Sequence, residues 1–263
     1  MYSIDHSSAL RFELESAKDA IMNFRTKPGL IFESNELDLA KLPRIDSHLH
    51  TSWTDGKATV LEVYKAAIDC GLATILYSEH SRKTSTDWFP LFANEVRALP
   101  SALCRAYVGT EVKVETRSGE IDTTSEISDL CDFVMASVHR FIDSGGHTMQ
   151  FADTDPDEAV NLEFELTWAV LANPKVDILG HMFGMSFRRF NLVPPDEKIQ
   201  ALIMRAAKFG VAVEINSHYH PNPRKLVQWC KKAGALITFG SNAHTLDTVG
   251  EIMRMLEQKT SNV

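Results

Sequence analysis

The chain has 263 residues, of which 44% are apolar and 24% are charged, and its formal net charge is −8. This composition is ordinary for a globular protein, and the length suits one large α/β domain or two small ones with a sizeable core. The acidic balance argues against a non-specific nucleic-acid binder. The four cysteines form no CxxC pair, no apolar run approaches a membrane span, and no leader opens the chain, so we expect a cytoplasmic protein without a membrane partner.

The first 42 residues differ from the rest of the chain. Apolar residues recur at near-helical spacing between Ala9 and Phe24, and Lys27-Pro28-Gly29 then breaks the pattern. We therefore predict that residues 1–42 form an N-terminal helical extension packed on the outside of a catalytic domain, which spans residues 43–263.

From Arg44 onward, short β-type runs alternate with amphipathic helical segments. Thr59 with Glu62 forms a capping box, and Asn222-Pro223 marks another helix start. The residues from Glu111 to Ile121 alternate and turn at Ser118-Gly119, which indicates a small hairpin. Strands are expected over 44–48, 74–78, 105–111, 133–137, 177–181, 211–216 and 235–240, and helices over 59–70, 87–99, 157–172, 196–209, 224–233 and 247–258.

This alternation predicts a parallel sheet, and about seven strand–helix units favour a closed barrel. The alternative is an open, doubly wound sheet. Two observations weigh against that alternative: no GxGxxG turn follows the first strand, and the candidate ligands are distributed over almost every strand.

Histidines gather at the ends of the expected strands. His48 and His50 are spaced i, i+2, so both imidazoles project from the same side of a strand, and Asp55 follows closely. Because all strands of a βα barrel end on one face, the strand-end groups should converge there. The full set at strand ends is His48, His50, His80, Glu111, His139, His181 and His244.

So many imidazoles with carboxylates and without cysteine favour zinc, manganese or iron. At roughly four protein ligands per ion, the set is too large for one metal. The sequence therefore predicts two or three clustered divalent ions.

The order of the motifs resembles the PHP (polymerase and histidinol phosphatase) family over residues 43–258. The resemblance implies a distorted seven-stranded, TIM-like (β/α)7 barrel with a trinuclear metal centre that hydrolyses phosphoesters through a metal-activated hydroxide. The matching segments are Asp46-Ser47-His48-Leu49-His50, Thr54-Asp55-Gly56, Ser78-Glu79-His80, Gly109-Thr110-Glu111, Ser137-Val138-His139, Leu179-Gly180-His181 and Gly240-Ser241-Asn242-Ala243-His244.

Carried over from the family, the ligands divide into three groups. His48, His50 and Glu111 would hold one ion together with Asn242. Glu111 would bridge to a second ion on His139 and His181, while Asp55, His80 and His244 would hold the third. Asn242 departs from the family, which usually has Asp there, and an amide brings no charge to the first ion. Glu79 also stands where the family commonly has Asp, before the histidine of the second strand.

The expected catalytic residues are Glu111, Asp55, His244 and Arg140. A phosphoesterase also needs cationic groups near its metals. Arg140 is the first candidate because it adjoins His139. The other substrate-binding candidates are Arg82, Lys83, Arg188, Arg189 and His218, the last in a second His-x-His with His220.

The leading hypothesis is a histidinol-phosphatase-like phosphomonoesterase that acts on a small phosphorylated substrate. Alternatives are a phosphodiesterase or 3′–5′ exonuclease, a metal-dependent amidohydrolase, and a degenerate PHP domain with a binding or regulatory role, which Asn242 motivates. A nucleic-acid substrate is disfavoured because no basic stripe with interleaved aromatics is present in the sequence. The sequence leaves open whether the protein is a monomer or a homo-oligomer.

Overall fold

The computed structural model describes residues 29–258, so the helix expected between Ala9 and Phe24 lies outside the described residues. One eight-stranded sheet organises the fold, in the order β1-β8-β7-β6-β5-β4-β3-β2. The seven strands from β2 to β8 run parallel, as the alternation predicted, and β1 joins β8 antiparallel. The strands are β1 (Phe32–Glu33), β2 (Ile45–Leu49), β3 (Thr74–His80), β4 (Arg105–Lys113), β5 (Phe133–Ser137), β6 (Ile178–Leu179), β7 (Ala212–Asn216) and β8 (Leu236–Gly240).

The sheet curls until its first and last parallel strands meet. A parallel bridge joins Leu49, at the end of β2, to Ala243, just past β8. The His50 N–H donates to the Ala243 carbonyl at 2.9 Å, and the Ala243 N–H donates to the His48 carbonyl at 3.0 Å. β1 occupies the opposite end of β8. The predicted barrel therefore closes at the carboxyl ends of its strands.

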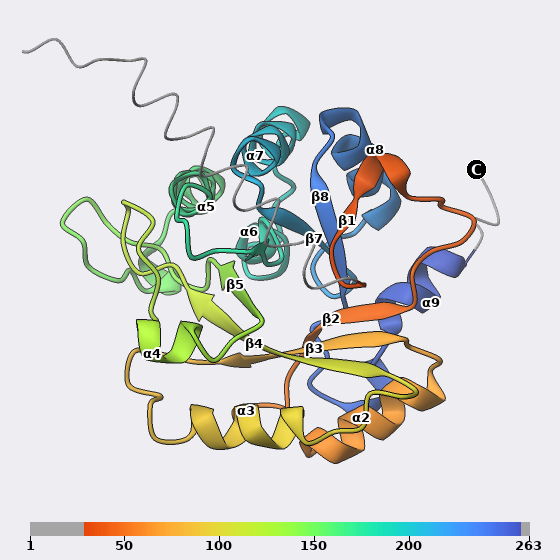
Figure 1. Ribbon diagram of the computed structural model, residues 1–263. Coiled ribbons are helices and arrows are strands. Elements are labelled where there is room, and N and C mark those ends of the chain that lie inside the picture. Colours follow the sequence, from red (N-terminus) through yellow and green to blue (C-terminus); the bar gives the residue numbers. More distant parts are fainter. Residues whose placement is uncertain (1–28, 259–263) are drawn as a thin grey trace, which may run out of the picture.

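Helices cover the outside of the curled sheet (Figure 1). In this view α2 and α3 lie below β2, β3 and β4, whereas α5, α6, α7 and α8 lie above. None of the helices within residues 29–258 is long and apolar enough to cross a membrane. The α-helices are α2 (Val60–Asp69), α3 (Phe89–Arg97), α4 (Ser125–Ser128), α5 (Pro156–Val170), α6 (Gly184–Arg188), α7 (Asp196–Phe209), α8 (Pro223–Ala233) and α9 (Glu251–Glu257), and the 3-10 turns are η1 (Ser34–Glu36), η2 (Phe151–Asp153) and η3 (Leu246–Thr248).

The capping signals in the sequence act where they were expected. At α2 the Thr59 side chain accepts from the Glu62 N–H while the Glu62 carboxylate accepts from the Thr59 N–H, which completes the capping box. Asn222 caps α8 ahead of Pro223. These helix starts fix where each helix packs back onto the sheet.

Two segments show how well local patterns predicted the backbone. The hairpin after β4 is confirmed by an antiparallel bridge between Val114 and Ile121. The helix expected over 247–258 instead begins at Glu251, so that prediction was wrong at its start. Gly250 has a φ of 71°, which an α-helix does not allow, and its N–H donates to the Asp46 carboxylate at 2.8 Å.

Every residue of β2, β5 and β7 is buried. Strands buried on both faces are expected in a parallel sheet that helices cover from outside. Apolar side chains such as Ile75, Phe133 and Ile237 build the core. Many buried polar residues, among them His48, Glu111 and His181, instead gather toward the carboxyl ends of the strands. The barrel therefore presents a polar site at one end of an apolar body.

Candidate metal centre

The strand-end histidines converge as the sequence predicted. The side chains form three groups, and within each group the possible ligand atoms all lie within 4.8 Å of one another. Two residues belong to more than one group. Glu111 belongs to two groups, and His50 also belongs to two. The groups are His48, His50 and Glu111; Glu111, His139 and His181; and His50, Asp55, His80 and His244.

The first group is fully buried at the end of β2. The Nε2 atoms of His48 and His50 lie 3.1 Å apart. The Asn242 Oδ1 lies 3.1 Å from the same His50 Nε2, so the amide is in the place that the family resemblance gave to a ligand. Asn242 has a φ of 51°, a left-handed conformation that asparagine tolerates better than most residues.

The second group surrounds one of the two carboxylate oxygens of Glu111, Oε1. The Oε1 atom lies 2.8 Å from His181 Nε2 and 3.2 Å from His139 Nε2. His181 is buried, whereas a quarter of the His139 side chain is exposed. This group therefore opens toward solvent on the β5 side.

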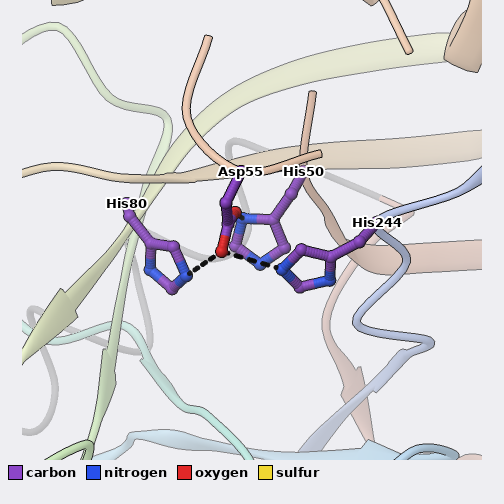
Figure 2. A group of neighbouring side chains, drawn as sticks. All are labelled: His50, Asp55, His80 and His244. Carbon is purple, nitrogen blue, oxygen red and sulfur yellow. Dashed lines mark ion pairs between the residues drawn. The ribbon is translucent and has the colours of Figure 1, made fainter. Parts of the chain in front are cut away.

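The third group is drawn in Figure 2, where the Asp55 carboxylate lies between His80 and His244 with His50 beside it. Asp55 Oδ2 is 3.2 Å from His244 Nε2 and 3.5 Å from His80 Nε2. His244 Nδ1 lies 3.0 Å from the Asn242 carbonyl, to which it can donate, and this leaves Nε2 with its lone pair toward the group. The three imidazoles thus approach one carboxylate from different strands.

Glu111 supplies the strongest test of whether these residues fit metal ions. Its buried Oε2 atom has no hydrogen-bond partner in the described part of the chain. Nitrogens of His48, His50 and His80 nevertheless surround this oxygen at 3.3, 3.6 and 3.2 Å. A buried carboxylate oxygen facing imidazole nitrogens without a hydrogen bond fits a bridging ligand between divalent ions.

The neighbouring imidazoles dominate the charge state of the carboxylates. Burial alone would raise the pKa of Glu111, but the imidazoles of His139 and His48 hold that pKa well below its usual range. Asp55 behaves alike: burial acts upward on its pKa, and hydrogen bonds from His244 and His80 lower it overall. Both carboxylates are therefore ready anionic ligands at neutral pH.

Glu214, on β7, orients ligands of two different groups from outside them. One oxygen, Oε1, lies 2.8 Å from His48 Nδ1 and also accepts the Asn216 amide at 2.7 Å. The other, Oε2, accepts the His181 backbone N–H at 2.6 Å. With Nδ1–H donated to Glu214, His48 directs the lone pair of Nε2 at His50 and Glu111. The sequence pattern did not reveal this orienting role of Glu214.

Two further buried carboxylates fix the loops that carry ligands. Glu79 accepts the Thr51 N–H at 2.6 Å and the Thr54 hydroxyl, and so anchors the turn that presents Asp55. Burial raises the pKa of Glu79 to about 7. Asp46 accepts the Ser241 N–H at 2.9 Å and thereby ties β2 to the segment after β8. Both fix the backbone near ligands without joining a ligand group.

A cleft of ≈ 610 Å³ opens over the second and third groups. Asp55, Glu111, His80, His139 and His244 reach it from the groups. Its other lining residues are Thr54, Ser81, Arg82, Lys113, Arg140, Met185, Tyr219 and Asn242. The groups therefore face a space that a small molecule can enter.

The predicted cationic residues divide between this cleft and its surroundings. Arg82 and Arg140 line the cleft, whereas Lys83, Arg188 and Arg189 do not. Lys83 forms an ion pair with Glu115. Sequence reasoning missed Lys113, which does line the cleft; it stands two residues after Glu111, and the alternation of a strand places both on one face.

The second His-x-His motif has two different surroundings. His220 is buried, with Nδ1 accepting the Asn216 N–H and Nε2 facing the Met182 carbonyl, each at 3.0 Å. Burial lowers the pKa of His220 to about 4, so a neutral imidazole joins β7 to the β6–α6 turn. His218 lies outside the cleft lining and contacts the Arg188 guanidinium at 3.1 Å.

Comparisons with known proteins agree with this geometry. The family model for the PHP domain matches residues 46–218. A probable phosphatase of Vibrio atlanticus is 30% identical over 223 residues, covering 79% of this chain and 80% of the relative. A probable phosphatase of Clostridium acetobutylicum is 27% identical over 218 residues, covering 78% and 81%.

Two solved structures share the fold. The histidinol phosphate phosphatase of Lactococcus lactis, determined with zinc, L-histidinol and phosphate, superposes with a TM-score of 0.60 at 20% identity, covering 84% of this chain and 94% of that one. The putative histidinol phosphatase of Listeria monocytogenes gives 0.63 at 15% identity, covering 80% and 99%. The relatives, the fold and the three ligand groups together support a metal-dependent phosphoesterase.

Proposed function

This chain belongs to the PHP domain family, and from that premise we propose that it is a phosphomonoesterase acting on small phosphorylated molecules. The observation that carries the proposal is the position of Glu111. Its two oxygens face different imidazole groups, an arrangement suited to one carboxylate shared between neighbouring ions. Phosphoester hydrolysis is a reaction that such clustered ions support.

The proposed ligands are the nine residues that the family resemblance indicated. Imidazole and carboxylate donors without thiolate suit zinc, manganese or iron, and we propose two or three such ions. The ligands are His48, His50, Asp55, His80, Glu111, His139, His181, Asn242 and His244.

When bound, the ions would supply Lewis acidity that lowers the pKa of water and offsets charge on the phosphate oxygens. Glu111, Asp55 and His244 line the wall of the cleft, where they would hold the ions. Arg140 adjoins His139 and lines the same cleft, so its guanidinium can pair with oxygens of the reacting phosphate. Arg140 also stacks over the Phe151 ring, 5.1 Å from its centroid, which limits how far the guanidinium swings.

The test joins metal analysis of protein purified without chelator to phosphate release from a panel of monoesters. The metal-loaded protein should release phosphate. Glu111→Gln should lose bound metal and more than about 100-fold in activity, because losing a group that only hydrogen-bonds a ligand already costs roughly 10- to 100-fold. Glu165→Gln, at an exposed position on α5, is the matched control and should behave as the wild type. Failure of the fully loaded protein on every ester would refute the proposal.

Asn242 favours a second candidate, a PHP domain that binds a phosphorylated ligand without turning it over. An amide gives the first group one anionic ligand fewer than a carboxylate would. Asn242→Asp distinguishes the two candidates. A rise in activity of several orders of magnitude from almost nothing would support the binding role, whereas substantial wild-type turnover would exclude it.

A further inference from the structure

Three basic side chains line the cleft beside the ligand groups. Arg82 follows β3, Lys113 ends β4 and Arg140 follows β5. These three strands are consecutive neighbours in the sheet. The cations therefore form a row along one side of the cleft.

Each of these cations follows a proposed ligand by one or two residues in the chain. Lys113 and Glu111 belong to the same strand two residues apart, so they share a face, with their Cα atoms roughly 7 Å apart along the strand. Arg82 likewise comes two residues after His80, and Arg140 adjoins His139. The basic row thus lies beyond Glu111, His80 and His139 in chain order, on the side of the strands' carboxyl ends.

The cleft lining carries few compensating charges. Its acidic members within residues 29–258 are Asp55 and Glu111, and both belong to the ligand groups. Lys113 pairs at 3.1 Å with Asp122, which is largely buried and does not line the cleft. Among the residues that the structure describes, no carboxylate forms an ion pair with Arg82 or Arg140. Arg82 and Arg140 therefore keep their charge without a protein carboxylate, and Lys113, which shares its charge with Asp122, still lines the cleft.

We propose that the substrate carries a second anionic group, a carboxylate or a second phosphate, which Lys113 and Arg82 bind while Arg140 is directed to the reacting phosphate. Because Lys113 follows Glu111 by two residues on the same face of β4, the second group would lie beside the reacting phosphate, on the Lys113 side of the cleft. A substrate with an ammonium group in this position would be repelled by Lys113 and Arg82 and would find no free carboxylate to pair with in the cleft lining. The inference rests on the proposed phosphomonoesterase function and narrows its substrate class.

The first test compares esters that differ in this second group, using the metal-loaded protein. Phosphate release is measured for 3-phosphoglycerate against glycerol 3-phosphate, for fructose 1,6-bisphosphate against fructose 6-phosphate, and for phosphoethanolamine. We expect kcat/KM to be roughly 10- to 100-fold higher for each ester with a second anionic group than for its partner without one, the range of one charge-assisted hydrogen bond. Phosphoethanolamine should be the poorest substrate, and the two pairs separate a carboxylate preference from a phosphate preference.

The second test removes the cations one at a time. Lys113→Gln and Arg82→Gln should each raise KM roughly 10-fold or more for the esters that carry a second anionic group, with little change in kcat. The partner esters, which carry only the phosphate, should change little. Lys65→Gln, at an exposed site on α2, is the control and should leave all values unchanged.

The outcomes are distinguishable. Equal losses on both classes of ester would mean that these cations bind the reacting phosphate, and would overturn the inference. So would equal kcat/KM for the paired esters. Both results would leave the phosphomonoesterase function standing, whereas no release from any ester would refute that function and this inference with it.

Discussion

Replacing Glu214 by glutamine should weaken metal binding although Glu214 belongs to none of the ligand groups. The carboxylate only accepts hydrogen bonds: from His48 and Asn216 at Oε1, and from the His181 N–H at Oε2. A glutamine must present its NH2 to one of these two sides. Facing His181, it sets two donors against each other in a buried site. Facing His48, it stabilises the tautomer whose proton is on Nε2, the atom that faces His50.

The magnitude follows from the bonds that are lost. One charge-assisted hydrogen bond contributes about 1.5–3 kcal/mol, and a buried donor left without an acceptor costs about 1–3 kcal/mol. The sum of about 2.5–6 kcal/mol is divided between folding and ligand orientation. Loss of an outer partner usually weakens metal affinity by roughly 10- to 100-fold, and we expect Glu214→Gln to lie in that range.

Competition with a chromophoric chelator measures this affinity directly. Glu163→Gln is the matched control, because Glu163 is an equally buried carboxylate that accepts the Met185 and Ser186 N–H groups and, within residues 29–258, hydrogen-bonds none of the proposed ligands. It should lose stability and retain metal affinity. If Glu214→Gln bound metal within about twofold of the wild type, Glu214 would not set the His48 tautomer and the reasoning would be wrong.

Three other predictions concern the same region. The Asn242→Asp variant should bind one more ion than the wild type, or bind the ion of the first group at least about 10-fold more tightly, because unit charges 4 Å apart attract by about 4 kcal/mol at an effective dielectric of 20. Atomic emission spectroscopy of the dialysed protein measures the metal content, and an unchanged content would contradict this prediction. Chelator treatment should lower the unfolding temperature of the wild type, because ions that bind only the native state stabilise it, and an unchanged temperature would argue against bound metal. Burial raises the pKa of Glu163 from 4.5 to about 7, so its contribution to stability should be lost as the pH rises from about 4.5 to 7, by about 3 kcal/mol in all. Glu163→Gln should flatten that slope in denaturant titrations, and an unchanged slope would show that other groups cause it.

The sequence predicted that the strand-end side chains converge, because that convergence follows from two local rules, whereas their division into groups came from the family resemblance. Spacing of i, i+2 placed His48 and His50 on one side of β2, and alternation of strands with helices put the ends of all strands on one face. Those rules were enough to bring His50 and His244 together across the whole chain. They depend on periodicity and not on the details of packing.

Other parts of the site depend on packing between distant segments, which a single sequence does not reveal. Nothing local indicates that Glu163 on α5 accepts hydrogen bonds from the start of α6, or that Arg188 contacts His218 outside the cleft. The left-handed conformation of Phe183, which precedes α6, was equally hidden. The predicted division between an N-terminal extension (1–42) and a catalytic domain (43–263) stays a prediction, although β1, which lies within the extension, pairs with β8 of the sheet.

The seam between β2 and the segment after β8 has a consequence for how the protein is made. His50 and Asn242 are neighbours in space but stand 192 positions apart in sequence. On a ribosome the first histidines emerge long before the strand that completes their surroundings, so a growing chain exposes isolated imidazoles and no finished centre. We expect closure of the barrel and uptake of metal to occur together, late in synthesis. A chain truncated before β8 should therefore be inactive in full, with no partly active form.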